Sequence, residues 1–130
     1  MGSGLNLYLQ MAAKRPFQWG SADCATFVLE WFDLLSARTR AHLWAGAYDT
    51  EEGCAEWTAR QGGYAAIAKA FLGGWYDAKP CEPKRGNAVC CRYRGTEAMG
   101  IRVDDRKVAL RTKGGLLITH RVDVLAEFGI

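Results

Sequence analysis

The residues most able to do chemistry stand in one short run, Phe17-Gln18-Trp19-Gly20-Ser21-Ala22-Asp23-Cys24. An aromatic–glycine turn leads into an Asp–Cys pair, which opens an amphipathic segment. A cysteine in the first turn of a helix lies near unpaired N–H groups and the positive end of the helix dipole, and both favour a thiolate. Cys24 is therefore a candidate nucleophile with Asp23 beside it. Burial in an apolar pocket would act the other way and leave Cys24 a structural thiol.

Nucleophilic catalysis also needs a base, and the chain has two histidines, His42 and His120. His120 ends a β-prone segment in the same alternation as Leu116 and Ile118, so it would approach Cys24 if that sheet packs on the Cys24 helix. The alternative is a structural histidine whose hydrogen bonds are satisfied at the end of the strand. His42 lies between two predicted helices, where a surface role is typical of a lone histidine.

Two tryptophans are candidates for binding a partner. Trp19 and Trp75 fall in predicted loops and are free to contact another molecule, whereas Trp31 and Trp57 lie on helix faces that pack in the core. The arginines of the C-terminal third are expected to be solvated, as one face of an interface with an acidic partner.

The five cysteines do not predict disulfides, a metal or any cofactor. Their number is odd, no Cys-x-x-Cys occurs, and reduced thiols are expected. Cys90 and Cys91 are adjacent on a predicted strand, so they point to opposite faces and cannot share one ion. We expect them, with Cys81, to be small buried hydrophobic residues.

Length and charge restrict the class of protein further. The 130 residues predict one domain with its own core. A net charge of +3, spread along the chain, does not favour nucleic-acid binding. No apolar run reaches the roughly 18 residues of a membrane span.

Periodicity and turn residues predict helices first and strands afterwards, which is an α+β order. The helical part covers about residues 3–74 and the sheet part about 87–130. Helices are expected near 5–14, from Cys24 to Leu35, at 50–61 and at 64–72. Strands are expected at 88–93, 99–103, 107–112 and 116–120, with a possible fifth at 127–130, in a small antiparallel sheet.

The aromatic-Trp-Gly-x-x-Asp-Cys start of the second helix resembles the NlpC-like branch of the papain-fold cysteine peptidases. More narrowly, the chain resembles a short phage and prophage domain of unknown function from that superfamily. Its other motifs follow in the right order: Tyr48, Asp49 and Gly53; Gly62-Gly63; Arg85-Gly86-Asn87; and Met99-Gly100-Ile101. The match spans nearly the whole chain, and the resemblance implies an NlpC-like papain fold.

The resemblance also implies peptidoglycan cleavage by a Cys–His pair, in which a histidine on the second strand activates the thiol and protonates the leaving amine. That histidine usually begins a His-x-Gly-Ile stretch, and the matching position here holds Ala98. The position of the third, orienting group falls near Arg111. The Asp of the Arg-Gly-Asp turn is Asn87. Of the catalytic set, the resemblance leaves only Cys24.

We therefore expect a phage or prophage tail-tip (baseplate) component of the virion, assembled in the bacterial host cytoplasm. It would keep the fold of a cysteine hydrolase as a pseudoenzyme and work through contacts with other tail-tip proteins. The alternative is an active peptidoglycan amidase or endopeptidase that opens the cell wall during DNA entry, with Cys24 as nucleophile and His120 as an unconventional base. A redox or metal module built on the cysteines is a distant third.

Overall fold

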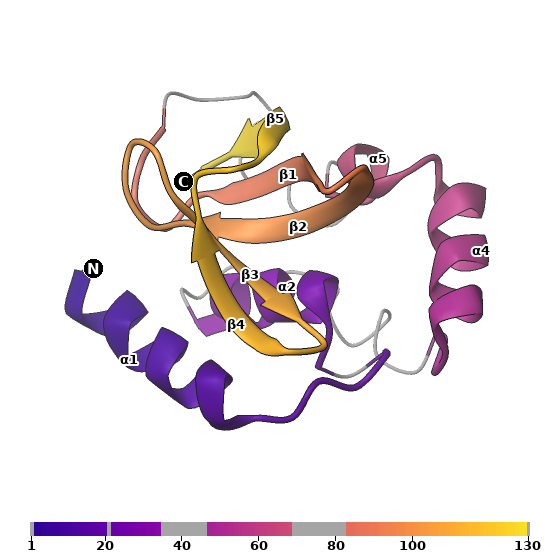
Figure 1. The fold of residues 1–130 in the computed structure, drawn as a ribbon, viewed down its shortest axis with the longest axis horizontal. Helices are drawn as coiled ribbons and strands as arrows, with labels where there is room; N and C mark the ends of the chain where they lie inside the picture. The colour runs from indigo at the N-terminus through magenta and orange to yellow at the C-terminus, as the bar shows by residue number, and fades with distance from the viewer. Residues whose placement is uncertain (1, 21, 35–46, 69–82, 130) are drawn as a thin grey trace.

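The computed structural model of the chain describes residues 2–20, 22–34, 47–68 and 83–129. In these residues helices precede strands, as the sequence predicts (Figure 1). The helices are α1 (Gly2–Lys14), α2 (Cys24–Leu34), α4 (Glu51–Gln61) and α5 (Tyr64–Ala68). None of them has both the length and the apolar character that a membrane crossing requires.

Five antiparallel strands form one open sheet in the order β4-β3-β2-β1-β5. The strands are β1 (Ala88–Tyr93), β2 (Thr96–Arg102), β3 (Val108–Thr112), β4 (Gly115–Thr119) and β5 (Asp123–Phe128). A two-residue turn joins β1 to β2, and both of its residues, Arg94 (φ 51°) and Gly95 (φ 80°), adopt the left-handed conformation that such tight hairpins require. β5 returns to pair with the outer side of β1, which makes β1 an interior strand.

Three helices, α1, α2 and α5, pack on the sheet, and α4 packs on α5. Figure 1 shows α2 behind the β3–β4 hairpin and α4 on the outside of the molecule. The main core joins the apolar stripe of α2, including Phe27, Val28 and Trp31, to Met99 and Ile101 of β2. The α+β prediction is therefore confirmed.

Alternation along the strands gives the sheet a second buried face. Val89, Cys91, Val108 and Leu110 form a separate apolar cluster, whereas Cys90 belongs to the main core. The two adjacent cysteines therefore point to opposite faces, as the strand period predicts. The described cysteines are free thiols.

Several predicted boundaries differ from the observed ones. β2 begins at Thr96 rather than at 99, because the tight turn lets Thr96 and Glu97 pair directly with Tyr93 and Arg92. β5 begins at Asp123 rather than at 127. β4 ends at Thr119, so residue 120 follows the strand instead of ending it. The predicted continuation of α5 to Leu72 falls outside the described residues.

A buried ion pair ties β2 to β5. Arg102 donates from Nη2 to Glu127 Oε1 at 2.6 Å and from Nε to Oε2 at 3.3 Å, and both side chains are buried. Asn87 Nδ2 donates to the same Oε2 at 2.9 Å. Because Asn87 holds the position of an Asp in the turn motif, an acid there would place a second buried carboxylate against Glu127, at a cost in stability.

Candidate functional site

The turn that precedes α2 is built around Gly20 and Asp23. Gly20 has φ 85°, and a Cβ there would collide with the carbonyl oxygen of Tyr48. Backbone bonds between Gln18 and Ala22 close the turn at 3.0 and 2.8 Å. Only glycine fits both the positive φ and the close approach, so this motif position has a structural cause.

Asp23 is the N-cap of α2. Its Oδ1 accepts hydrogen bonds from the backbone N–H groups of Ala25 and Thr26, and its Oδ2 accepts from the Gly20 N–H at 2.9 Å and from the Tyr48 hydroxyl at 2.6 Å. The carboxylate is buried and fully engaged in positioning the start of the helix. The structure thus assigns Asp23 a capping role.

Cys24, the first residue of α2, lies half-buried beside α4 and α5. Its thiol donates to the hydroxyl of Tyr64 at 3.7 Å, and the same hydroxyl pairs with the Cys54 thiol at 3.5 Å. Two thiols from different helices therefore share one phenol. Sequence reasoning missed both Tyr64 and Cys54, because neither lies near Cys24 along the chain.

The Cys24 thiol is protonated at neutral pH. Burial raises its pKa from 9.0 to about 12, and the neighbouring Asp23 charge acts in the same direction. A backbone hydrogen bond from Met99 and the Tyr64 hydroxyl oppose this shift without reversing it. Burial therefore sets the protonation state of Cys24. The position at a helix N-terminus, which from the sequence alone would favour a thiolate, does not lower the pKa enough.

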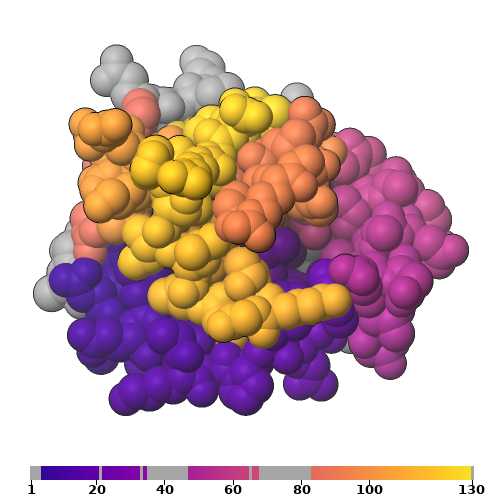
Figure 2. Space-filling model, in the orientation of Figure 1, coloured from indigo at the N-terminus to yellow at the C-terminus, as the bar shows by residue number. Residues whose placement is uncertain are grey.

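Cys24 lies at an open pocket of about 910 Å³, the Cys24 pocket, bordered by Phe17 and Trp19, by α4 and α5, and by the ends of β1, β2 and β3 with their turns. Figure 2 shows a hollow where the orange and yellow hairpins meet the magenta α4–α5 region. A volume near the upper end of the usual range for ligand sites is enough for a short peptide.

Ala98 borders the same pocket, although its side chain lies with Cys91 on the sheet face of the second cluster and not on the face of the main core that Cys24 joins. The β2–β3 ladder runs from Arg102–Val108 to Gly100–Leu110 and stops there. The pocket opens beyond that point, between Ala98 on β2 and the end of β3. Gly100 permits the close pairing before the opening, because a Cβ there would lie 2.6 Å from the Ala109 carbonyl oxygen.

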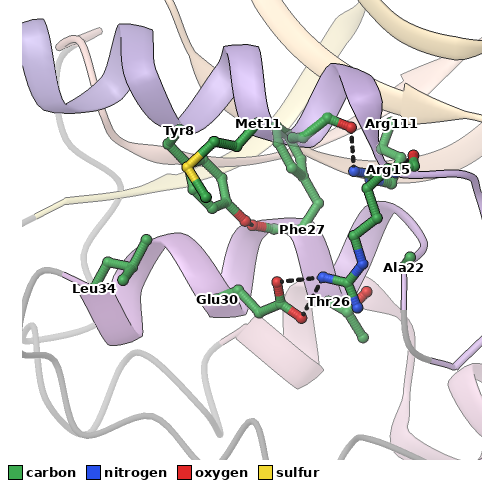
Figure 3. A pocket seen from close by; sticks show the side chains of 10 residues that line it. Tyr8, Met11, Arg15, Ala22, Thr26, Phe27, Glu30, Leu34 and Arg111 are labelled. Carbon is green, nitrogen blue, oxygen red and sulfur yellow. Dashed lines mark hydrogen bonds and ion pairs between the residues drawn. The ribbon is translucent and has the colours of Figure 1, made fainter.

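Arg111, near the expected position of an orienting group, is committed elsewhere. Its guanidinium donates to the carbonyl of Arg15 at 2.7 Å and to the carbonyl of Ala12, and so satisfies the C-terminal end of α1 (Figure 3). It also lies 6.0 Å from the centre of the Phe27 ring. Arg111 thereby fastens α1 to the sheet.

A second, smaller pocket of about 370 Å³ lies between α1 and α2. Figure 3 shows the side chains that line it. Its walls include Tyr8, whose hydroxyl donates to the Phe27 carbonyl at 2.6 Å. Arg15 and Glu30 form an exposed ion pair across it at 2.9 Å. These contacts join the two helices.

The structure does not bring His120 to Cys24. In the β3–β4 hairpin, the end nearest the pocket is the Thr112–Gly115 turn, whereas His120 is exposed and follows the opposite end, beyond the Val108–Thr119 pair. Five residues of extended chain correspond to about 16 Å. Among the described residues that line the Cys24 pocket none is a histidine. His42 lies outside the described part of the chain.

Trp19 borders the Cys24 pocket and packs edge-on against Phe17 with ring centres 4.8 Å apart. The Lys113 ammonium lies 5.7 Å from the centre of the Trp19 ring and 3.4 Å from Glu51. Trp75 falls outside the described residues. Within the described ranges, no three His, Cys, Asp or Glu side chains are grouped to hold a metal ion.

The family model described as Domain of unknown function (DUF6950) matches residues 2–130, so the chain belongs to that family. No curated protein and no solved structure matches it significantly.

Proposed function

We propose that this DUF6950 member is a structural component of a phage or prophage tail tip, with an NlpC-like papain fold and a cysteine site that no longer catalyses hydrolysis. The proposal rests on one observation above all. Cys24 lies at the start of a helix packed on β2, and the pocket position where the resembling peptidases supply an imidazole holds the methyl group of Ala98.

The protonation state of Cys24 supports loss of catalysis. A thiol with a pKa of about 12 is a thiolate in about one molecule in 10⁵ at pH 7. A peptidase needs a base within hydrogen-bond reach of that thiol. The nearest side-chain partner in the described residues is the Tyr64 hydroxyl, whose pKa burial raises above its ordinary value.

The motif residues that remain have structural roles. Gly20 allows the turn to pass the Tyr48 carbonyl, Asp23 caps α2, and Gly100 lets β2 approach β3. Each would be retained for folding after the catalytic pair was lost. The best-preserved part of the resemblance is thus the part that holds the cysteine helix on the sheet.

The hydrolase alternative is favoured by a different observation, the open Cys24 pocket itself, which has room for a substrate peptide. That function would require a base to reach Cys24 from a position that the described fold does not bring near it. We therefore prefer the non-catalytic function.

Three measurements test the choice. The protein should appear in the tail fraction of purified particles by mass spectrometry, and particles carrying Cys24→Ala should infect as well as the parent. Purified protein should leave bacterial sacculi undigested. Absence from the particles would overturn the virion proposal, and digestion of sacculi that is lost in Cys24→Ala would establish the hydrolase instead.

A further inference from the structure

The rim of the Cys24 pocket carries two cations, each lying on an aromatic ring. Lys113, in the β3–β4 turn, lies over Trp19, and Arg94, in the β1–β2 turn, lies 5.4 Å from the centre of the Tyr93 ring. All four residues border the pocket. An aromatic ring beneath a cation holds it in place and leaves its outer side available to an anion.

In the free protein, Lys113 already pairs with a carboxylate of the same chain, Glu51. Glu51 of α4 lies 3.4 Å from Lys113, and the two side chains are 61% and 63% exposed. An ion pair this exposed contributes little to stability and exchanges readily with another carboxylate. Glu51 therefore occupies a place at the pocket rim that an incoming acidic group could take.

The other carboxylate of the rim, Glu97, has a neighbouring cation. It lies directly opposite Arg92 in the β1–β2 ladder, on the same face of the sheet. When an incoming carboxylate replaces Glu51, the pocket presents Lys113, Arg94 and the carbonyl-bound Arg111 against the single carboxylate of Glu97, so its lining is net positive. The walls beneath them are largely apolar and include Phe17, Trp19 and Leu110.

We infer that the Cys24 pocket is a docking site for an extended acidic segment of a partner protein. Alternate side chains of an extended peptide point to opposite sides. A segment with alternating acidic and apolar residues would place its apolar side chains against the pocket walls and its carboxylates at Lys113 and Arg94. This inference rests on the proposed function, because it names the chemistry of a partner for a protein that acts through contacts.

The test uses two dye-labelled peptides, Glu-Leu-Glu-Leu-Glu and Lys-Leu-Lys-Leu-Lys, blocked at both ends and titrated with the whole chain while fluorescence anisotropy is followed. The glutamate peptide should bind saturably with a dissociation constant below about 1 mM. Binding should weaken with added salt. The lysine peptide should not bind. No saturable binding of the glutamate peptide, or equal binding of both peptides, would overturn the inference.

Substitutions of the two partners in the Glu51–Lys113 ion pair should change the peptide affinity in opposite directions. Glu51→Gln removes the internal competitor and should tighten binding about two- to fivefold, whereas Lys113→Met should weaken it about fivefold or more. Glu52→Gln and Arg106→Met are matched controls, because each removes one exposed charge that does not border the pocket, and both should change affinity less than twofold. Equal effects of test and control variants would show that net charge alone attracts the peptide.

The outcome separates this inference from the proposed function. Digestion of sacculi would overturn the non-catalytic function whether or not the peptide binds. Undigested sacculi together with no peptide binding would overturn the docking site alone.

Discussion

Replacing Ala98 by histidine should restore reactivity to Cys24. Ala98 is half-buried and borders the pocket, but its side chain lies with Cys91 on the sheet face of the second cluster, so a histidine there reaches Cys24 only around the open end of the β2–β3 ladder. An imidazolium about 4–6 Å from the sulfur should lower the thiol pKa by about 1–3 units. The thiolate fraction at a given pH below the pKa then rises about 10- to 1,000-fold.

The rate gain is smaller than the gain in thiolate, because a thiolate of lower pKa is a weaker nucleophile. With a Brønsted coefficient of about 0.4–0.5, the net acceleration of alkylation should be about 3- to 60-fold. Iodoacetamide alkylation at pH 6 to 9, with peptide mapping to identify Cys24, measures it. The gain should be largest while the imidazole is protonated and should diminish as pH rises through its pKa.

Thr96→His is the matched control, because residue 96 borders the same pocket two positions before residue 98 in β2, about 7 Å away. It should change the alkylation rate little. If Ala98→His folds with the parent's thermal stability and its Cys24 reacts no faster, residue 98 does not face the sulfur. The central argument of the proposed function would then be wrong.

Three further predictions concern stability. Gly20→Ala should destabilise the chain by more than about 4 kcal/mol in urea unfolding, because its Cβ meets the Tyr48 carbonyl. Gly95→Ala, also at positive φ but with open space around it, should cost about 1–2 kcal/mol. Similar costs for the two variants would refute the clash with the Tyr48 carbonyl. Arg102→Met should lower the free energy of unfolding by about 3–5 kcal/mol, because it leaves the Glu127 carboxylate buried and unpaired. Adding Glu127→Gln should recover part of that stability. If it recovers none, lost packing and not the unpaired charge causes the destabilisation. Burial raises the pKa of Cys90 from 9.0 to about 12, so the stability that this thiol contributes below pH 9 should be lost as pH rises toward 12. Cys90→Ala should therefore lose less stability than the parent between pH 8 and 11. Equal losses in the two proteins would contradict this prediction.

Local sequence signals predicted the elements that hold the site. The apolar stripe that begins at Cys24 identifies α2 without any tertiary information. The turn residues around 94–95 and 113–115 likewise separate the strands. Boundaries were less accurate where pairing with a neighbour extends a polar strand end, as at Thr96.

The surroundings of Cys24 could not be predicted, because they come from distant segments. Tyr64 lies 40 residues away along the chain, and its contact with Cys24 depends on how α5 packs. The helix dipole is visible in the sequence, but the burial that raises the thiol pKa is not. Alternation along β4 suggested a core-facing His120, yet Ile118 of the same face is 48% exposed.

The return of β5 to the outer side of β1 has a consequence for how the chain reaches its native state. β1 is flanked by β2, made directly after it, and by β5, made about 35 residues later. Until residues 123–128 emerge from the ribosome, one edge of β1 is unpaired and Glu127 is not yet available to Arg102. A nascent chain at that stage has an unpaired strand edge, and Arg102 lacks its carboxylate partner. Its tendency to aggregate should therefore fall sharply once β5 has paired with β1.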